Sequence, residues 1–209
     1  MRVAILTWEY PPRVVGDMAL YVQSLSQQLA KQEFETHVVT YNEDLKGVQE
    51  EASGATVHRV GNPVKTHLNI LTWVLTLSQE FERVTADIHH DIGPIDLLDC
   101  QEWITVPAAC SLSKALRIPY VMTIHSLEEQ RARNPDNPAS LTIRHFERLG
   151  THNSSRIIVA SQKMKEEVQR LHNVPETMIE TIPKPIDFGK KISEIYTNAV
   201  KTWKERKET

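Results

Sequence analysis

Residues 3–8 read Val-Ala-Ile-Leu-Thr-Trp, and residues 9–16 continue Glu-Tyr-Pro-Pro-Arg-Val-Val-Gly. The first run is apolar almost throughout, which is typical of a parallel strand covered by helices on both faces. The prolines and the glycine of the second run end that strand in a loop. An amphipathic helix over residues 18–31 follows, with Asp17 as its predicted N-cap. A strand, a loop and a helix in this order predict the first unit of an α/β fold.

The same alternation continues along the rest of the chain. Further strands are predicted over residues 34–41, 56–60, 95–100, 120–124, 156–160 and 177–182. Further helices are predicted over residues 67–83, 106–116, 141–149 and 163–171, the last capped by Ser161. The polar and acidic residues 42–54 are expected to form an exposed loop. This order predicts a single Rossmann-like domain with a parallel sheet and helices on both faces.

Length and composition agree with one domain. The chain has 209 residues, of which 40 % are hydrophobic and 24 % are charged, and its net charge is −3. Without a basic excess, nucleic acid is not an expected partner. No stretch approaches the ~18 apolar residues of a membrane span, and residues 1–8 are too short for an export signal. Cys100 and Cys110 match no zinc or redox spacing, so we expect reduced thiols and a cytoplasmic location.

Ligands of parallel α/β sheets bind outside the carboxyl ends of the strands. Four segments follow predicted strands and should therefore matter most: residues 9–16, 99–105, 125–137 and 161–162.

Five segments resemble, in order, motifs of glycosyltransferases with the GT-B fold, of the glycogen and starch synthase type. They are TWEYPPRVVG at 7–16, QEWITVPAA at 101–109, TIHS at 123–126, IIVASQKMKEEV at 157–168 and IPKPID at 182–187. The family forms are W-E-Y/F-P-P with a later G-G, H-D-W-x-T/A-x-P-A-A, T-x-H-x, V-I-x-x-S-x-x-M-x-E-E-V and I-P-N-G-V/I-D. Residues 1–187 are thus similar to the family's amino-terminal domain.

The resemblance implies a function as well as a fold. Members of the family carry two Rossmann-like domains around a cleft; the first chiefly binds the acceptor and the second holds the nucleotide-sugar. They transfer glucose from a nucleotide-sugar to a glucan or other sugar acceptor with retention of configuration. The resemblance implies no cofactor and no bound metal.

The first predicted site residue is Gly16. A glycine before a helix lets backbone amides approach a phosphate. The family's second glycine is replaced by Asp17, which would cap the helix itself and place a negative charge there. Both a phosphate contact and a plain capped turn remain open at this position.

The second predicted site residue is His125, which matches the family's histidine near the transferred sugar. Such a histidine can hydrogen-bond a sugar hydroxyl or support developing charge. The alternative is a loop histidine with a structural partner.

Four more candidates for substrate binding come from the same motifs. Glu102 could accept hydrogen bonds from an acceptor and Trp103 could stack on a sugar ring; alternatively they are a helix-start carboxylate and a core tryptophan. Glu128 and Arg131 match an acidic residue and an arginine that often follow the family's histidine. The alternative for these two is a solvated, mobile loop.

The end of the chain predicts a helix rather than a second domain. Apolar residues recur at helical spacing at Ile192, Ile195, Tyr196, Ala199, Val200 and Trp203. Residues 188–209 are thus expected to form an amphipathic helix, either packing back on the first domain as the family's last helix does, or a generic helix. We expect the donor-binding domain to be missing, so that the isolated chain lacks turnover and binds nucleotide-sugar weakly or not at all. Glu43 and Glu51 match the donor domain's E-x7-E spacing by chance.

Alternative functions follow from the same residues. The chain could be a non-catalytic module that associates with itself or with a separate donor-domain chain. A nucleotide-binding Rossmann protein is disfavoured, because no G-x-G-x-x-G follows the first strand. His89, His90 and Asp91 are adjacent and have no third ligand at metal-site spacing, so they predict an exposed turn.

Overall fold

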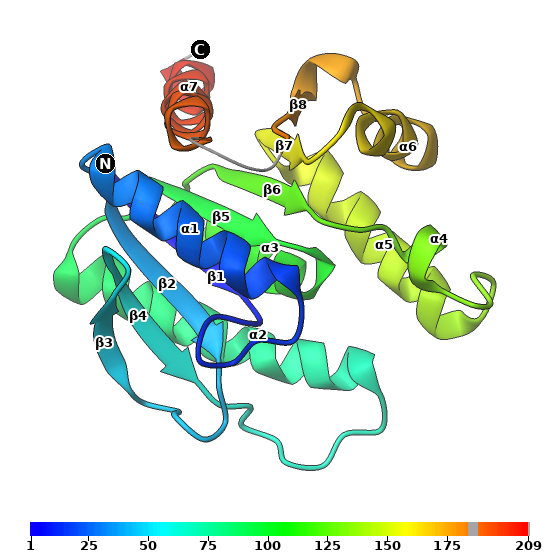
Figure 1. Cartoon of the computed structure of the whole chain (residues 1–209), viewed down its shortest axis with the longest axis horizontal. Coiled ribbons are helices and arrows are strands. Elements are labelled where there is room, and N and C mark those ends of the chain that lie inside the picture. Colours follow the sequence, from blue (N-terminus) through cyan, green and yellow to red (C-terminus); the bar gives the residue numbers. More distant parts are fainter. Residues whose placement is uncertain (184–187, 209) are drawn as a thin grey trace.

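One twisted sheet forms the centre of the molecule (Figure 1). A computed structural model describes residues 1–183 and 188–208. The strands are β1 (Arg2–Thr7), β2 (Glu35–Tyr41), β3 (Gln49–Ala52), β4 (Ala55–Val60), β5 (Leu97–Gln101), β6 (Tyr120–Ile124), β7 (Arg156–Val159) and β8 (Ile179–Thr181). Their order is β3-β4-β2-β1-β5-β6-β7-β8, and every neighbouring pair is parallel except β3 with β4.

Helices cover both faces of this sheet. They are α1 (Asp17–Lys31), α2 (Ile70–Asp87), α3 (Val106–Leu116), α4 (Glu128–Arg131), α5 (Pro138–Asn153), α6 (Gln162–His172) and α7 (Gly189–Glu208). Short helical turns are η1 (Ile88–Ile92), η2 (Trp103–Thr105) and η3 (Glu176–Met178). α1 and α7 lie on one face, and α2, α3, α5 and α6 lie on the other (Figure 1). The predicted Rossmann-like α/β fold is confirmed.

Strand β1 lies in the middle of the sheet and is buried on both sides. Val3 and Ile5 belong to the core beneath α1 and α7, whereas Ala4 and Leu6 belong to the core beneath α2 and α3. All four side chains have no exposed surface. This confirms the interpretation of residues 3–8, because a strand with two buried faces needs apolar residues at consecutive positions.

The last helix, α7, packs back on the domain. Ile192, Tyr196 and Ala199 are fully buried in one cluster with Val22 of α1. Trp203 donates a hydrogen bond from Nε1 to the carbonyl oxygen of Arg117, at 3.1 Å. The predicted closing helix is therefore present. Residues 184–187, which hold most of the IPKPID segment and the predicted domain boundary, lie outside the described residues.

Three local predictions were wrong. Residues 42–54 are not all loop, because 49–52 form the antiparallel edge strand β3. The second helix begins at Ile70 rather than at 67, because Asn69 caps it by accepting from the Thr72 backbone at 3.0 Å. Asp17 is the first residue of α1 and not its cap; the N-cap is Gly16, which has no side chain to cap with. An exposed edge strand carries little apolar pattern, which explains the first error.

The segment His89-His90-Asp91 lies in the helical turn η1. His90 and Asp91 are exposed within η1, whereas His89 is half-buried and accepts from the Ile95 backbone at 3.1 Å. Across residues 1–183 and 188–208, no group of three or more His, Cys, Asp and Glu side chains could hold a metal ion. Within the same ranges, no helix has the length and apolar character needed to span a bilayer.

Candidate functional site

The loops after β1, β5 and β6 meet around a cavity of about 440 Å³. β1 lies between β2 and β5, so the direction of winding reverses there, and doubly wound sheets bind ligands at such a point. The cavity is lined by Trp8, Glu9, Val15, Gly16, Asp17, Met18, Glu102, Trp103, Ile104, His125, Ser126 and Arg131. Five of the six predicted site residues are in this list: Gly16, Glu102, Trp103, His125 and Arg131. Glu128 lies behind Arg131.

In the turn before α1, the backbone amides are hydrogen-bonded to a carboxylate of the same chain, that of Glu9. Glu9 is 2 % exposed, and its Oε2 atom accepts hydrogen bonds from the backbone nitrogens of Val15 at 2.6 Å and Gly16 at 2.8 Å. These are the amides that a phosphate would use at a helix N-terminus. Asp17 adds a second carboxylate to the same wall. Glu9 therefore occupies the loop amides that lead into α1, while the N-cap Gly16 makes no side-chain hydrogen bond to the first turn of the helix.

Glu102 joins the loop after β5 to the loop after β6. Its Oε1 atom accepts from the backbone nitrogens of His125 at 2.6 Å and Ser126 at 2.7 Å, and Arg131 lies 3.3 Å from its Oε2 atom. Burial raises the pKa of the Glu102 carboxyl, while Arg131 and the backbone amides act in the opposite direction. Glu102 also has a φ of 66°, a left-handed conformation that costs energy in a residue other than glycine. The carboxylate thus fixes the backbone beneath His125.

His125 is half-buried at the centre of the three loops. Its Nε2 atom lies 2.8 Å from the Gln101 side-chain oxygen, and the Tyr21 ring meets the imidazole edge-on with centroids 4.9 Å apart. Contacts from two elements hold the ring orientation. A histidine held this way can make a directional hydrogen bond to a ligand in the cavity.

Arg131 is surrounded by three carboxylates. Besides Glu102, it contacts Glu128 at 3.3 Å and Glu147 of α5 at 3.1 Å. Glu128 is 7 % exposed and accepts from the Ser140 hydroxyl at 2.7 Å, so the alternative of a solvated loop was wrong for Glu128, whereas Gln130 and Arg133 are exposed. A short helix, α4, with buried polar partners stands in its place.

Glu147 is a site-supporting residue that the sequence did not indicate. Its Oε1 atom accepts from the Glu128 backbone at 2.7 Å, and burial raises the pKa of its carboxyl to about 7. His172 lies 3.7 Å away, but burial lowers the pKa of that imidazole to about 4, so the two do not form an ion pair near neutral pH. A lone glutamate within a helix gives no local signal of such a role.

Two tryptophans form apolar walls of the cavity. Trp103 is 6 % exposed and stacks on Phe146 with centroids 6.4 Å apart, so most of its surface serves the core. Trp8 is more exposed, meets Trp73 edge-on and carries the Arg13 guanidinium 4.8 Å from its ring centre. Trp8 therefore offers more ring surface to a ligand than Trp103 does.

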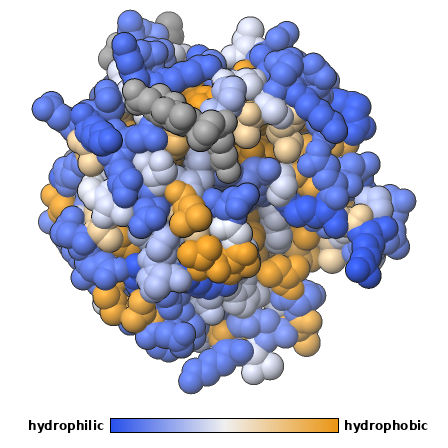
Figure 2. All heavy atoms as spheres, viewed as in Figure 1, coloured by the Kyte–Doolittle hydropathy of each residue, from blue (hydrophilic) through white to orange (hydrophobic). Residues whose placement is uncertain are grey.

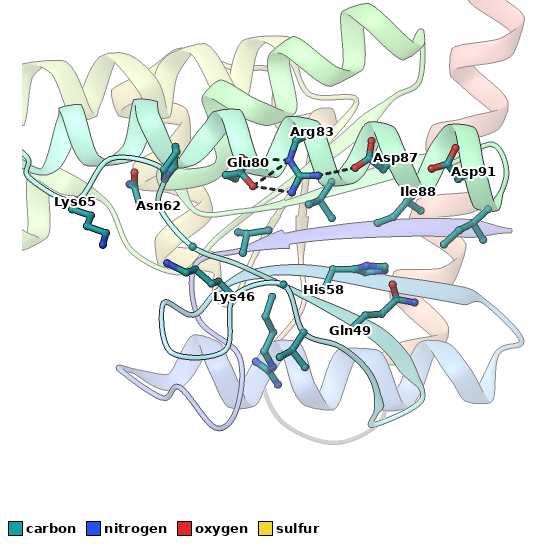
Figure 3. Close-up of a pocket in the computed structure, with 18 residues that line it drawn as sticks. Lys46, Gln49, His58, Asn62, Lys65, Glu80, Arg83, Asp87, Ile88 and Asp91 are labelled. Carbon is teal, nitrogen blue, oxygen red and sulfur yellow. Dashed lines mark hydrogen bonds and ion pairs between the residues drawn. The ribbon is translucent and has the colours of Figure 1, made fainter.

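A larger cavity of about 600 Å³ lies between α2 and the strands β3 and β4 (Figure 3). Arg83 lies over its middle and pairs with Glu80 and Asp87, each at 2.9 Å. Lys65 lies toward one end and Asp91 toward the other (Figure 3). None of the predicted site residues lines it, and its α2 cation, Arg83, is already paired with two carboxylates, so the smaller cavity is the better candidate site.

The family of the chain follows from comparison with known proteins. Residues 18–190 match the family described as Glycosyltransferase Family 4. The chain belongs to this glycosyltransferase family. An uncharacterized glycosyltransferase of Methanocaldococcus jannaschii is 34 % identical over 182 residues, which are 87 % of this chain and 45 % of the relative. Glycogen synthase of Mycobacterium tuberculosis is 24 % identical over 211 residues, covering 91 % of this chain and 49 % of the enzyme.

A solved structure of another protein has the same fold. A chain of sucrose-phosphate synthase from Thermosynechococcus elongatus superposes with a TM-score of 0.71 at 15 % identity, covering 95 % of this chain and 98 % of that one. The predicted resemblance to a GT-B amino-terminal domain of the glycogen and starch synthase type is confirmed. The chain spans about half the length of the curated relatives it matches.

Proposed function

We propose that this chain forms the acceptor side of a glycosyl-transfer site. Residues 1–187 would be the acceptor-binding domain, and residues 188–209 the helix that closes back on it. The observation that carries the proposal is the convergence of Trp8, Glu102, Trp103 and His125 on one cavity at the switch point of the sheet. This places aromatic surface beside polar groups, the combination that a sugar ring with hydroxyls requires.

The reaction that fits this site is transfer of glucose from a nucleotide-sugar to a glucan or other sugar acceptor. The bond from the anomeric carbon to the donor phosphate oxygen breaks and the nucleoside diphosphate leaves. The acceptor hydroxyl oxygen bonds to the anomeric carbon, and its proton passes to the departing phosphate. His125 would hydrogen-bond a sugar hydroxyl or support developing charge, held in place by Gln101 and Tyr21. Glu102 and Arg131 would act mainly by fixing the loops around the sugar.

The donor phosphates would bind to a different surface. The amides of Val15 and Gly16 are occupied by Glu9, and Asp17 would repel a diphosphate beside them. The resemblance assigns the residues that hold the donor phosphates to the family's second domain, and the chain spans about half the length of the curated relatives it matches. We therefore propose that these residues bind an acceptor without turning over a donor by themselves.

Two measurements on the 209-residue protein test this division. Incubation with ADP-glucose or UDP-glucose and a maltooligosaccharide should give no transfer; robust transfer would contradict the proposal. Calorimetric titration with the maltooligosaccharide should give binding that weakens at least about tenfold in His125→Ala, the loss expected for one or two hydrogen bonds. The matched control, Glu80→Ala in the larger cavity, should bind as the wild type does.

A second candidate is a module that binds a protein partner, either another copy or a separate donor-domain chain. Figure 2 shows apolar side chains gathered in the middle of the face that α1 covers. Val14, Val15 and Leu20, from the loop after β1 and the start of α1, are 52 %, 60 % and 55 % exposed. Light scattering after size-exclusion chromatography distinguishes the cases: a strict monomer at high concentration would contradict self-association.

The state of the two cysteine thiols bears on the cellular compartment in which the protein would reside. Cys100 is buried and Cys110 is half-buried, and neither forms a disulfide. Burial raises the pKa of both thiols, which keeps them protonated and unreactive. These features support our proposal of a reducing compartment such as the cytoplasm.

A further inference from the structure

A chain of buried hydrogen bonds runs from the last helix to the candidate site. The Tyr196 hydroxyl of α7 lies 2.5 Å from Oδ2 of Asp99 on β5, although the two residues are 97 positions apart. The same Oδ2 atom accepts from Nε2 of Gln101 at 2.6 Å, and Oε1 of Gln101 lies 2.8 Å from Nε2 of His125. Tyr196, Asp99 and Gln101 have no exposed surface. The path therefore excludes water until it reaches His125.

The direction of each bond is set at Asp99. Its carboxylate receives three donors, because the Thr123 hydroxyl also donates to Oδ1 at 3.1 Å. Burial raises the pKa of Asp99 to about 6, and the three hydrogen bonds act against that rise. The titratable groups facing Asp99 from the helices are the phenols of Tyr21 and Tyr196, whose pKa values are both raised, so both keep their protons. Above about pH 6, Asp99 can only accept.

A carboxylate that only accepts fixes the Gln101 amide. The amide must turn its NH2 group toward Asp99 and its oxygen toward His125. An amide oxygen in turn accepts only from a protonated nitrogen, so Nε2 of His125 carries the proton. The tautomer of a histidine is generally set by the partner of one ring nitrogen, and here that partner is itself fixed by two buried residues.

We propose that Tyr196 is a positioning residue which, through Asp99 and Gln101, holds His125 as the Nε2–H tautomer. The closing helix then does more than cover the sheet, because its docking sets the hydrogen-bonding character of the site histidine. The importance of this tautomer for transfer rests on the proposed function. The tautomer itself can be measured without activity, so the two ideas fail separately.

Loss of the Tyr196 hydroxyl should allow the Gln101 amide to reverse and the His125 tautomer to change. With one donor fewer, the pKa of Asp99 should rise by about one to two units, since a hydrogen bond to a charged group contributes roughly that much. A protonated Asp99 can donate to Oε1 of Gln101, and the amide then turns its NH2 group toward His125. His125 must accept at Nε2, and its proton moves to Nδ1.

The test is a long-range 15N–1H spectrum of the histidine rings in the full chain at about pH 7. The ring nitrogens distinguish protonated from unprotonated sites, and His125→Gln identifies the signals of His125. Wild type should show Nε2–H, and Tyr196→Phe should show a substantial gain of Nδ1–H at the expense of Nε2–H. Asp99→Asn should show the same gain, because an asparagine side chain can donate as well as accept.

Tyr120→Phe is the matched control. Tyr120 is also buried, and its hydroxyl donates to the Gly150 carbonyl oxygen at 2.7 Å, outside this hydrogen-bond chain. The control should keep the wild-type tautomer. Three results would overturn the proposal: Nδ1–H in wild type, an unchanged tautomer in Tyr196→Phe, or an equal change in Tyr120→Phe. If Asp99→Asn fails to fold, the wild type and Tyr196→Phe still decide.

Discussion

The Oε1 atom of Glu102 lies 2.6 Å from the backbone nitrogen of His125 and so ties the loop after β5 to the loop after β6. Glu102→Ala should remove the acceptor for this amide and for that of Ser126, and leave Arg131 with one carboxylate fewer. We expect the free energy of unfolding to fall by about 2–4 kcal/mol, because buried donors without acceptors are costly. Urea denaturation measures the change.

Glu102→Gln separates the loss of the acceptor oxygen from the loss of the negative charge. Glu102→Gln keeps an oxygen for the two amides and should lose less than half as much stability as Glu102→Ala. If Glu102→Ala were as stable as wild type, the carboxylate would not be the link between the two loops.

Glu147 makes stability depend on pH. Its folded-state pKa of about 7 lies above the usual 4.5, mainly because of burial. The folded state therefore binds this proton more tightly, so the contribution is full below about pH 4.5 and is lost as pH rises through about 7. In Glu147→Gln, which cannot ionise, unfolding free energy relative to wild type should rise by on the order of 3 kcal/mol between pH 4 and 8.

The control for Glu147 is Glu194→Gln, on the exposed side of α7. Its stability relative to wild type should stay flat across the same pH range. A flat difference for Glu147→Gln as well would show that Glu147 does not titrate in this window.

Much of this fold could be predicted from residue patterns. The run at residues 3–8 indicated a strand buried on both faces, and Ser161 was correctly predicted to cap α6, where it accepts from the Met164 backbone at 3.2 Å. Five of the predicted site residues line one cavity. They were chosen from motifs that resemble the family's, and the segments that hold them follow predicted strands, whose carboxyl ends meet at one edge of a parallel sheet. These are local signals with a simple geometric consequence.

The features that were missed depend on tertiary contacts. Edge strand β3 has three exposed glutamine and glutamate positions and no apolar alternation. Asp17 has the residue type of a cap, but Glu9 reaches the turn from seven residues away. Glu147 comes to Arg131 only because α5 packs beside α4. Rules for residue spacing within one helix or strand cannot predict these contacts, because each joins two different segments of the chain.

The packing of α7 makes a further prediction. Ile192 has no exposed surface in the cluster shared with α1. Ile192→Ala should lower the free energy of unfolding by about 2–5 kcal/mol, the usual cost of removing such a buried side chain. Lys201→Ala, on the exposed face of the same helix, should change it by less than about 0.5 kcal/mol. Equal effects in chemical denaturation would mean that α7 does not pack as described.

Removal of the Glu9 carboxylate should make the loop before α1 available to an external anion. In the double variant Glu9→Ala with Asp17→Asn, the amides of Val15 and Gly16 lose their acceptor and the repelling carboxylate beside them is removed, so they should bind pyrophosphate at the start of α1. The amide signals of both residues should then shift on addition of pyrophosphate, whereas those of wild type should not. Shifts of the same size in wild type would contradict the view that Glu9 occupies this position.

An NMR titration of the full chain with a maltooligosaccharide, observed at its four tryptophan indole N–H signals, shows most directly whether an acceptor binds in the candidate cavity. Trp8 and Trp103 line the candidate cavity, and Trp203 lies on α7 against Arg117. We expect saturable shifts of the Trp8 and Trp103 signals with no shift at Trp203. No shift at Trp8 and Trp103 up to millimolar sugar, or a shift confined to Trp203, would contradict an acceptor site in this cavity.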